Sequence, residues 1–137
     1  MHYIFDSFEG LSCPAKCDKD YWKKGDLKTS INVLVYNLKP FESSIDYTIY
    51  PGWIPDQFAN LESSRISFLH IDVDIYQPTR DSVDFFYSRM AKGGVMLFDD
   101  YGFLTCPGAS AAVDEFFSDK IEKIFEIPCG GGFVIKA

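Results

Sequence analysis

Short apolar runs alternate with segments of helical spacing along most of the chain, and this alternation restricts the fold more than any other feature. Runs typical of strands lie at residues 3–5, 45–50, 66–73 and 95–98. Helical spacing covers residues 27–38, 56–61, about 78–90 and 109–117. Strands that alternate with helices build βαβ units around a mostly parallel sheet. The sequence therefore predicts an α/β fold, and we expect residues 1–137 to form a single domain.

The position of each strand in the sheet follows from its pattern. The two most apolar runs, 66–73 and 95–98, are expected at the centre, because strands covered on both faces read as continuous hydrophobic stretches. Gly93-Gly94 is expected to end the preceding helix. Residues 121–127 and 133–135 predict an antiparallel hairpin that turns at Gly130–Gly132. A phosphate cradle is a weaker interpretation of these glycines, since no helix follows them.

Aspartates follow the apolar runs at the points where the runs end. Asp6 follows the first run, Asp72 and Asp74 the third, and Asp99 and Asp100 the fourth. Ligands of open α/β sheets bind at this carboxyl edge, where neighbouring strands lie about 4.8 Å apart. Asp72, Asp99 and Asp100 on adjacent strands would repel one another unless a cation lies among them. An all-oxygen set without His or Cys suits a hard ion such as Mg²⁺.

Plainer roles stay open for these aspartates. Any of them can be a turn former or a helix N-cap. Asp74 is left out of the metal set, because it can cap the helix that starts near Pro78 or face solvent. His70 lies inside a strand, so we expect a buried core histidine rather than a base.

Composition excludes several classes of protein. With 13 basic and 20 acidic residues, the net charge is −7, which gives no bulk attraction to nucleic acid or anionic lipid. No apolar run approaches the roughly 20 residues that span a bilayer, and the first residues do not resemble a signal peptide. The four cysteines lack the spacing of a zinc site. A reduced, cytoplasmic protein is expected, with no nucleic-acid or membrane partner.

Several motifs, in chain order, resemble those of the macrocin O-methyltransferase (TylF-like) family. They are residues 5–10 (FDSFEG), 50–55 (YPGWIP), 69–76 (LHIDVDIY), 93–102 (GGVMLFDDYG), 106–109 (CPGA) and 112–117 (AVDEFF). The resemblance extends over nearly the whole chain. Its most specific part is the ordered pair of motifs that contain Asp72 and Asp99-Asp100.

This resemblance implies a Rossmann-like methyltransferase sheet of class I, mostly parallel with a C-terminal antiparallel hairpin. The implied activity is an S-adenosylmethionine- and Mg²⁺-dependent O-methyltransferase whose acceptor is a hydroxyl of a sugar or another natural product. Asp72, Asp99 and Asp100 are the implied metal ligands, and Asp72 is also the implied catalytic residue that helps to take the proton. The metal would lower the pKa of the acceptor hydroxyl and hold the oxygen in line with the methyl group.

The resemblance also implies the residues that bind the methyl donor: Asp6, Ser7, Gly52 and Trp53. Asp6 would accept the ribose hydroxyls, and Gly52 and Trp53 would flank the adenine. Simple packing also explains a tryptophan at position 53. The family often places a further base, a histidine, in the loop after the Asp6 strand, but residues 9–26 contain no histidine.

A first strand with a glycine-rich turn is implied as well, and no such motif precedes Asp6. That strand would lie between those ending at Asp6 and Asp72, and without it buried backbone groups stay unpaired at about 1–3 kcal/mol each. We therefore expect an N-terminally truncated domain that rearranges, borrows a strand or belongs to a longer gene product. Such a chain is expected to bind S-adenosylmethionine weakly or not at all.

Other functions stay open. A non-catalytic remnant would keep the fold, with or without the metal, and would not transfer methyl groups. Asp72-Val73-Asp74 also matches the Asp-x-Asp of nucleotide-sugar glycosyltransferases and, loosely, that of aspartate-nucleophile phosphatases. The former would not need Asp99-Asp100, and the latter want their motif after the first strand. A homo-oligomer is possible, but the sequence does not predict the oligomeric state.

Overall fold

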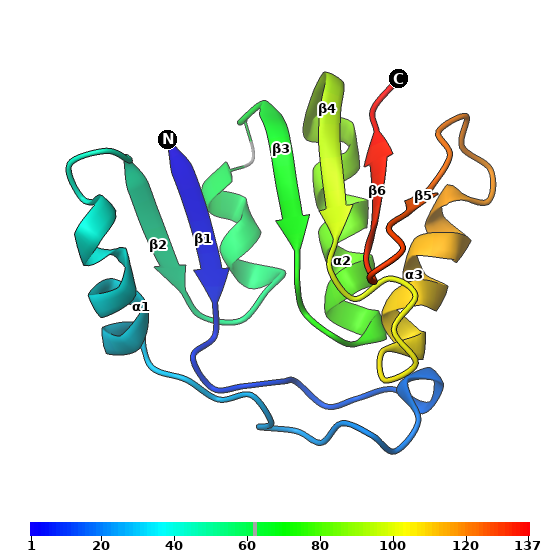
Figure 1. Ribbon diagram of the computed structural model, residues 1–137, viewed down its shortest axis with the longest axis horizontal. Helices are drawn as coiled ribbons and strands as arrows, with labels where there is room; N and C mark the ends of the chain where they lie inside the picture. The colour runs from blue at the N-terminus through cyan, green and yellow to red at the C-terminus, as the bar shows by residue number, and fades with distance from the viewer. Residues whose placement is uncertain (62) are drawn as a thin grey trace.

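The strands form two separate sheets in the computed structural model, which describes residues 1–61 and 63–137 (Figure 1). One sheet pairs β1 (His2–Asp6) in parallel with β2 (Tyr47–Pro51). The other has the order β3-β4-β6-β5. Its strands are β3 (Ile66–Ile71), β4 (Met90–Phe98), β6 (Gly132–Ile135) and β5 (Phe125–Glu126). β3 and β4 are parallel, whereas β6 is antiparallel to both β4 and β5, as the hairpin prediction requires.

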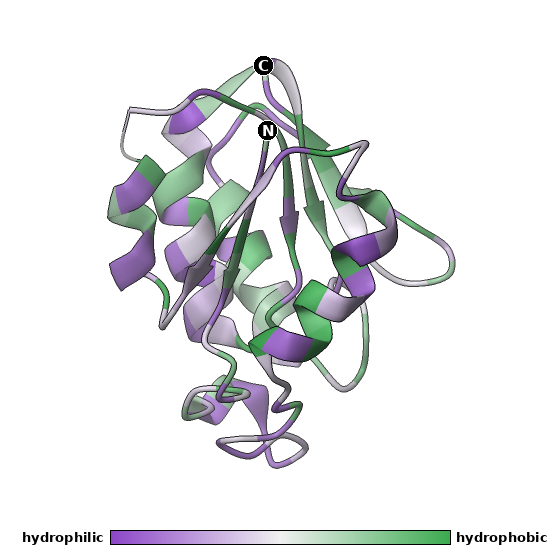
Figure 2. Cartoon of the chain, turned by 90° about the vertical axis from the view of Figure 1, so that its left-hand side faces the viewer, coloured by the Kyte–Doolittle hydropathy of each residue, from purple (hydrophilic) through white to green (hydrophobic). Residues whose placement is uncertain are grey.

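In the described residues, three α-helices and four short 3₁₀ helices connect the strands. The α-helices are α1 (Ile31–Leu38), α2 (Tyr76–Phe86) and α3 (Pro107–Phe117). The 3₁₀ helices are η1 (Lys16–Asp18), η2 (Lys39–Phe41), η3 (Asp56–Leu61) and η4 (Tyr87–Arg89). α2 and α3 cover one face of the four-stranded sheet (Figures 1 and 2). Within the described ranges, no helix has the length and apolar character that crossing a bilayer requires.

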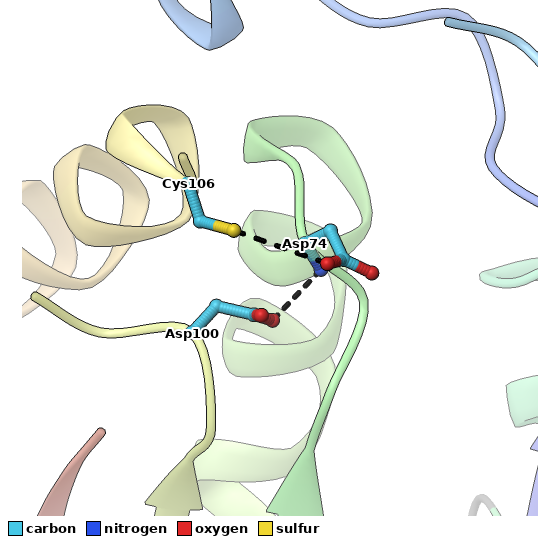
Figure 3. A group of neighbouring side chains, drawn as sticks. All are labelled: Asp74, Asp100 and Cys106. Carbon is cyan, nitrogen blue, oxygen red and sulfur yellow. Dashed lines mark hydrogen bonds between the residues drawn. The ribbon is translucent and has the colours of Figure 1, made fainter. Parts of the chain in front are cut away.

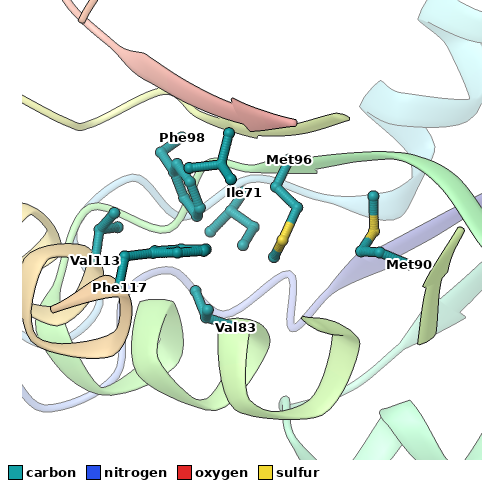
Figure 4. Close-up of a cluster of buried hydrophobic side chains, with 8 residues drawn as sticks. Ile71, Val83, Met90, Met96, Phe98, Val113 and Phe117 are labelled. Atoms are coloured by element: carbon teal, nitrogen blue, oxygen red, sulfur yellow. The ribbon is translucent and has the colours of Figure 1, made fainter. Parts of the chain in front are cut away.

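The main core lies between the four-stranded sheet and helices α2 and α3 (Figure 4). Side chains alternate across a strand, so Met96 and Phe98 of β4 point into this core. The opposite face of the sheet carries exposed apolar side chains, with Phe68 at 60% exposure. The buried residues of the core are Ile71, Val83, Met90, Met96, Phe98, Val113, Phe117 and Val134.

A second, aromatic cluster joins the two sheets. Phe5 of β1 contacts Phe58 of η3, with ring centroids 5.4 Å apart, and lies 6.3 Å from Phe86 of α2. Phe58 and Phe86 are almost fully buried. The β1–β2 pair is thus held to the rest of the molecule by side-chain packing.

Between β1 and β3, no strand of the described residues is present (Figure 1). This is the position at which the family resemblance implies a further strand. The strand beside the break is also less buried than a central strand would be, since Tyr3 of β1 is 39% exposed. Each of the two strands that border the break has a hydrogen-bonded neighbour on one side only.

Several predictions about elements need correction. β3 lies at an edge of its sheet rather than at the centre, whereas β4 is internal as expected. Gly93-Gly94 does not end a helix, because β4 already begins at Met90. Gly93 has φ 79°, and the pairing of β3 with β4 shifts register between Ile66 and Phe68. The glycines therefore lie in an irregular part of a strand.

Candidate functional site

Three carboxylates converge at the carboxyl ends of β3 and β4. The parallel pairing sets Ile71 opposite Phe98, so the residues that follow both strands leave the sheet at the same level. One oxygen each of Asp72, Asp99 and Asp100 lies within 4.8 Å of the other two. This is the arrangement that the sequence prediction of a cation site requires.

Asp100 is the buried member of the group, at 7% exposure. Its Oδ2 accepts the backbone N–H groups of Val73 at 3.1 Å and Asp74 at 2.8 Å. Burial raises the pKa of Asp100, and these two hydrogen bonds oppose the rise. Asp100 therefore shapes the chain that leaves β3 and also contributes a carboxylate oxygen to the group.

Mutual repulsion acts on the more exposed Asp72. Its pKa is raised, first by desolvation beside the strand ends and then by the charges of Asp100 and Asp99. His70 partly opposes this rise. Carboxylates that raise one another's pKa in this way release that repulsion when a cation neutralises them.

Asp74 does not have either of the roles predicted from the sequence (Figure 3). It is half-buried, with φ 63°, and its Oδ1 accepts a hydrogen bond from the Cys106 thiol at 3.9 Å. Burial and the charge of Asp100 raise the pKa of Asp74 to about 7. The N-cap of α2 is Ile75, without a side-chain cap. Asp74 is therefore neither a helix cap nor a solvated carboxylate.

Asp74, Asp100 and Cys106 form a second group with ligand atoms within 4.8 Å of one another. Burial raises the pKa of the Cys106 thiol, which favours the protonated form over the thiolate that binds metals. A thiol also suits a hard ion poorly. The all-oxygen group is consequently the better candidate for Mg²⁺.

His70 is not the buried core histidine that was expected. Its side chain is 44% exposed, and its Nε2 lies 3.4 Å from Asp99 Oδ1. His70 belongs to the uncovered face of the four-stranded sheet, next to the carboxylate group. The prediction failed because it assumed that both faces of this strand are covered.

The expected donor-binding residues meet in one pocket. This pocket, of about 260 Å³, is lined by Asp6, Ser7, Gly52 and Trp53 and also reaches Asp72. Asp6 Oδ1 accepts the N–H of residue 8 at 2.7 Å. Gly52 has φ 133° and donates its N–H to the Asp6 carbonyl at 2.9 Å, which ties the ends of β1 and β2 together. The roles of these four residues in donor binding stay predictions.

Sequence reasoning missed Asp18, which is only 1% exposed. Its Oδ1 accepts the N–H of Tyr76, the first residue of α2, at 2.7 Å. Its Oδ2 accepts the N–H of Ala15, also at 2.7 Å. A polar loop sequence gave no signal for this role, because the helix that Asp18 contacts begins 58 residues later.

Comparison with known proteins agrees with the architecture. Two curated Streptomyces proteins are similar in sequence. Demethyldecarbamoylnovobiocin O-methyltransferase of Streptomyces niveus is 33% identical over 66 residues, which are 48% of this chain and 24% of that protein. The 8-demethyl-8-(2,3-dimethoxy-alpha-L-rhamnosyl)-tetracenomycin-C 4'-O-methyltransferase of Streptomyces olivaceus is 30% identical over 115 residues, which are 78% of this chain and 44% of that protein. The chain thus spans less than half the length of either relative.

Solved structures show the same fold. The O-methyltransferase NovP superposes with a TM-score of 0.77 at 22% identity, over 98% of this chain and 59% of that one. The calicheamicin methyltransferase CalS11 superposes with a TM-score of 0.78 at 16% identity, over 97% and 59%. The family model of macrocin O-methyltransferase (TylF) matches residues 1–133. The chain therefore belongs to the macrocin O-methyltransferase (TylF) family.

Proposed function

We propose that the chain contributes the metal site and part of the donor site of an S-adenosylmethionine- and Mg²⁺-dependent O-methyltransferase. Its acceptor would be a hydroxyl of a sugar or another natural product. The observation that carries this proposal is the convergence of Asp72, Asp99 and Asp100 beside the pocket lined by Asp6 and Trp53. The two curated relatives, which are named as O-methyltransferases of a novobiocin precursor and of a rhamnosyl tetracenomycin, support this substrate class.

The residues fit Mg²⁺ on chemical grounds. The donor set is three carboxylates, with oxygen atoms within 4.8 Å of one another, and two of the three have raised pKa values. Bound there, Mg²⁺ would supply Lewis-acid activation of the acceptor hydroxyl. Asp100 would keep its ligand oxygen in place because its other oxygen is held by two backbone N–H groups.

The remaining chemistry belongs to side chains of the pocket. Asp6 would accept the ribose hydroxyls of the donor, with Ser7 and Gly52 beside it, and the indole of Trp53 would flank the adenine. Asp72 would receive the proton of the acceptor hydroxyl. The acceptor oxygen would then bond to the methyl carbon of the donor as the carbon–sulfur bond breaks. Asp72 lines the donor pocket and belongs to the carboxylate group, so it would lie beside both the methyl donor and the acceptor hydroxyl.

Transfer of a labelled methyl group tests the proposal. The 137-residue chain is incubated with labelled S-adenosylmethionine at millimolar concentration and a panel of glycosylated natural products, with Mg²⁺ or with a chelator. We expect Mg²⁺-dependent transfer that Asp72→Asn and Asp99→Asn abolish and that Asp46→Asn, an exposed control with the same charge change, retains. Transfer that is equal with chelator would contradict the metal dependence.

A non-catalytic remnant is the second candidate function, favoured by the break between β1 and β3. It would bind Mn²⁺ at the same carboxylates and give no labelled product with any acceptor. Loss of both binding and transfer would overturn both candidates.

Membership of this family argues against the Asp-x-Asp glycosyltransferase. The methyltransferase family accounts for Asp99-Asp100 and the other matched motifs, which a glycosyltransferase would not need.

The cellular setting belongs to the same proposal. We place the protein in the cytoplasm, because its cysteines Cys13, Cys17, Cys106 and Cys129 are free thiols. Its partner would be a small-molecule acceptor rather than nucleic acid, consistent with the net charge of −7.

A further inference from the structure

We propose that Asp18 is a positioning residue that fixes a strap across the candidate site. The strap is defined as residues 7–30, the irregular segment between β1 and α1. In Figure 1 it runs past the carboxyl ends of the strands, on the side where the three carboxylates lie. Gly10, Leu11, Ser12 and Leu27 of the strap line the same pocket as Asp6 and Asp72.

A single buried carboxylate links the strap to the helical layer. Asp18 accepts one N–H from the strap itself, at Ala15, and one from α2, at Tyr76, both at 2.7 Å. Hydrogen bonds of a carboxylate to backbone N–H groups are stronger than those between neutral groups. Because Asp18 is only 1% exposed, water does not compete effectively for these two N–H donors.

α3 packs against the same carboxylate. A Cβ added at Gly108 would lie only 1.7 Å from Asp18 Oδ1, so only glycine at this position leaves room for the carboxylate. Asp18 therefore sits where η1, the start of α2 and the first turn of α3 meet.

Other hydrogen bonds of the strap shape its interior. The Leu11 N–H donates to the Asp26 carbonyl, and the Gly25 N–H donates to the Leu11 carbonyl, both at 2.9 Å. These bonds close the strap on itself. The bond from Tyr76 to Asp18 instead connects it to the segment that directly follows Asp72 and Asp74.

The consequence is a coupling between the strap and the carboxylate group. Because Tyr76 follows Asp74 by two residues, a shift at Asp18 is passed to the chain that carries Asp72. The positioning role of Asp18 rests on the proposed function, because it assumes that Asp72, Asp99 and Asp100 bind a metal. The anchoring of the strap by Asp18 does not depend on metal binding.

Limited proteolysis of the native chain tests the anchor. The strap carries five exposed lysines as trypsin sites: Lys16, Lys19, Lys23, Lys24 and Lys28. In Asp18→Asn one of the two N–H donors faces an amide N–H₂ instead of an oxygen, so the strap opens more often. We expect cleavage in the strap to be about tenfold faster than in the wild type. The control is Glu122→Gln, which removes a buried carboxylate remote from the strap, and its strap cleavage should stay near the wild-type rate.

Mn²⁺ binding, measured by electron paramagnetic resonance, tests the positioning. We expect the Mn²⁺ dissociation constant of Asp18→Asn to rise about three- to tenfold, the size of effect that outer-shell partners of metal ligands produce. Glu122→Gln should keep the wild-type value when all variants are measured well below their melting temperatures. A merely structural anchor would free the strap and leave the dissociation constant unchanged, which would overturn the positioning role.

A second variant covers the case in which Asp18→Asn fails to fold. Gly108→Ala displaces the carboxylate without changing any charge, and it should show the same faster cleavage and weaker Mn²⁺ binding. Strap cleavage at the wild-type rate in the folded variants would refute the anchor. Absence of Mn²⁺ binding by the wild type would refute the proposed metal site, while the cleavage comparison would still decide the role of Asp18.

Discussion

Asp99→Asn should stabilise the protein without metal and remove its response to Mg²⁺. Asp99 is an exposed member of the carboxylate group, with 53% of its side chain accessible. Among residues 1–61 and 63–137, no backbone N–H donates to the Asp99 side chain, whereas two donate to Asp100. The substitution therefore removes a repulsive charge and little else besides its 3.4 Å contact with His70.

The magnitude follows from Coulomb's law. Asp99 repels Asp72 and Asp100 across separations of up to 4.8 Å between the grouped oxygens. Each such pair costs about 0.9 kcal/mol at the dielectric constant of water and about 3.5 kcal/mol at an effective value of 20. Because Asp99 is half exposed, the lower value applies to it. Allowing for the lost His70 contact, we expect a gain of about 1 kcal/mol, or about 3–5 °C in Tm.

Thermal unfolding followed by circular dichroism measures this gain. In chelator and low salt, Asp99→Asn should melt above the wild type, and the difference should shrink as salt screens the charges. Saturating Mg²⁺ at 100 times its dissociation constant should stabilise the wild type by about 2.7 kcal/mol and the variant far less. Asp46→Asn, exposed and remote from the group, is the charge-matched control. Melting of Asp99→Asn below the wild type in chelator, or equal Mg²⁺ stabilisation of both, would refute the reasoning.

Three further predictions concern stability and donor binding. Burial raises the pKa of Glu122, but hydrogen bonds from Lys136, Ala137 and Tyr87 outweigh it and lower the value to about 2. The unfolded carboxyl titrates near 4.5, so this group contributes about 3 kcal/mol above that pH, and the contribution is lost as pH falls from 4.5 toward 2. Acid titration of unfolding should accordingly be shallower in Glu122→Gln, and an unchanged profile would contradict the assignment. Met96→Ala, at a fully buried core position, should lower the free energy of unfolding in urea by about 2–5 kcal/mol, and a loss below 1 kcal/mol would mean that the core collapses around the cavity. Calorimetry with S-adenosylmethionine should detect no micromolar binding to the 137-residue chain, because none of the described strands lies between β1 and β3. A micromolar dissociation constant would overturn that expectation.

Much of the fold was predictable, because it depends on local periodicity. The strands ending at Asp6 and preceding Asp72, the parallel neighbours β3 and β4, and the C-terminal antiparallel pair all follow from apolar patterns and glycine turns. The boundaries were less accurate. Helix α1 begins at Ile31 rather than near residue 27, and it buries none of its side chains.

The burial of individual side chains was harder to predict, because it depends on which elements cover each face of the sheet. His70 sits in a run that reads as apolar on both sides, yet only the face toward α2 and α3 is covered. Its exposure is therefore a property of the whole sheet and not of residues 66–73. The edge position of β3 has the same origin, since no local pattern states which strand fills the place beside it.

The candidate site divides in the same manner. Asp72, Asp99 and Asp100 were predictable because strand ends of a parallel pair meet at one edge. Asp18 was not, because its partner Tyr76 is distant in sequence and its loop has no periodic pattern. The helix cap predicted for Asp74 was wrong, because Asp18 rather than Asp74 accepts the N–H of Tyr76 at the start of α2.

The aromatic contacts between the two sheets determine how the two halves of the candidate site are spaced. Asp6, Gly52 and Trp53 move with β1 and β2, whereas the carboxylates move with β3 and β4. No backbone ladder joins these two bodies in the described residues; Phe5, resting on Phe58 and Phe86, does. Ring contacts tolerate small rotations that a ladder of hydrogen bonds forbids. In the proposed enzyme, the spacing between the donor pocket and the carboxylate group would thus depend on the packing of aromatic rings rather than on a hydrogen-bonded ladder.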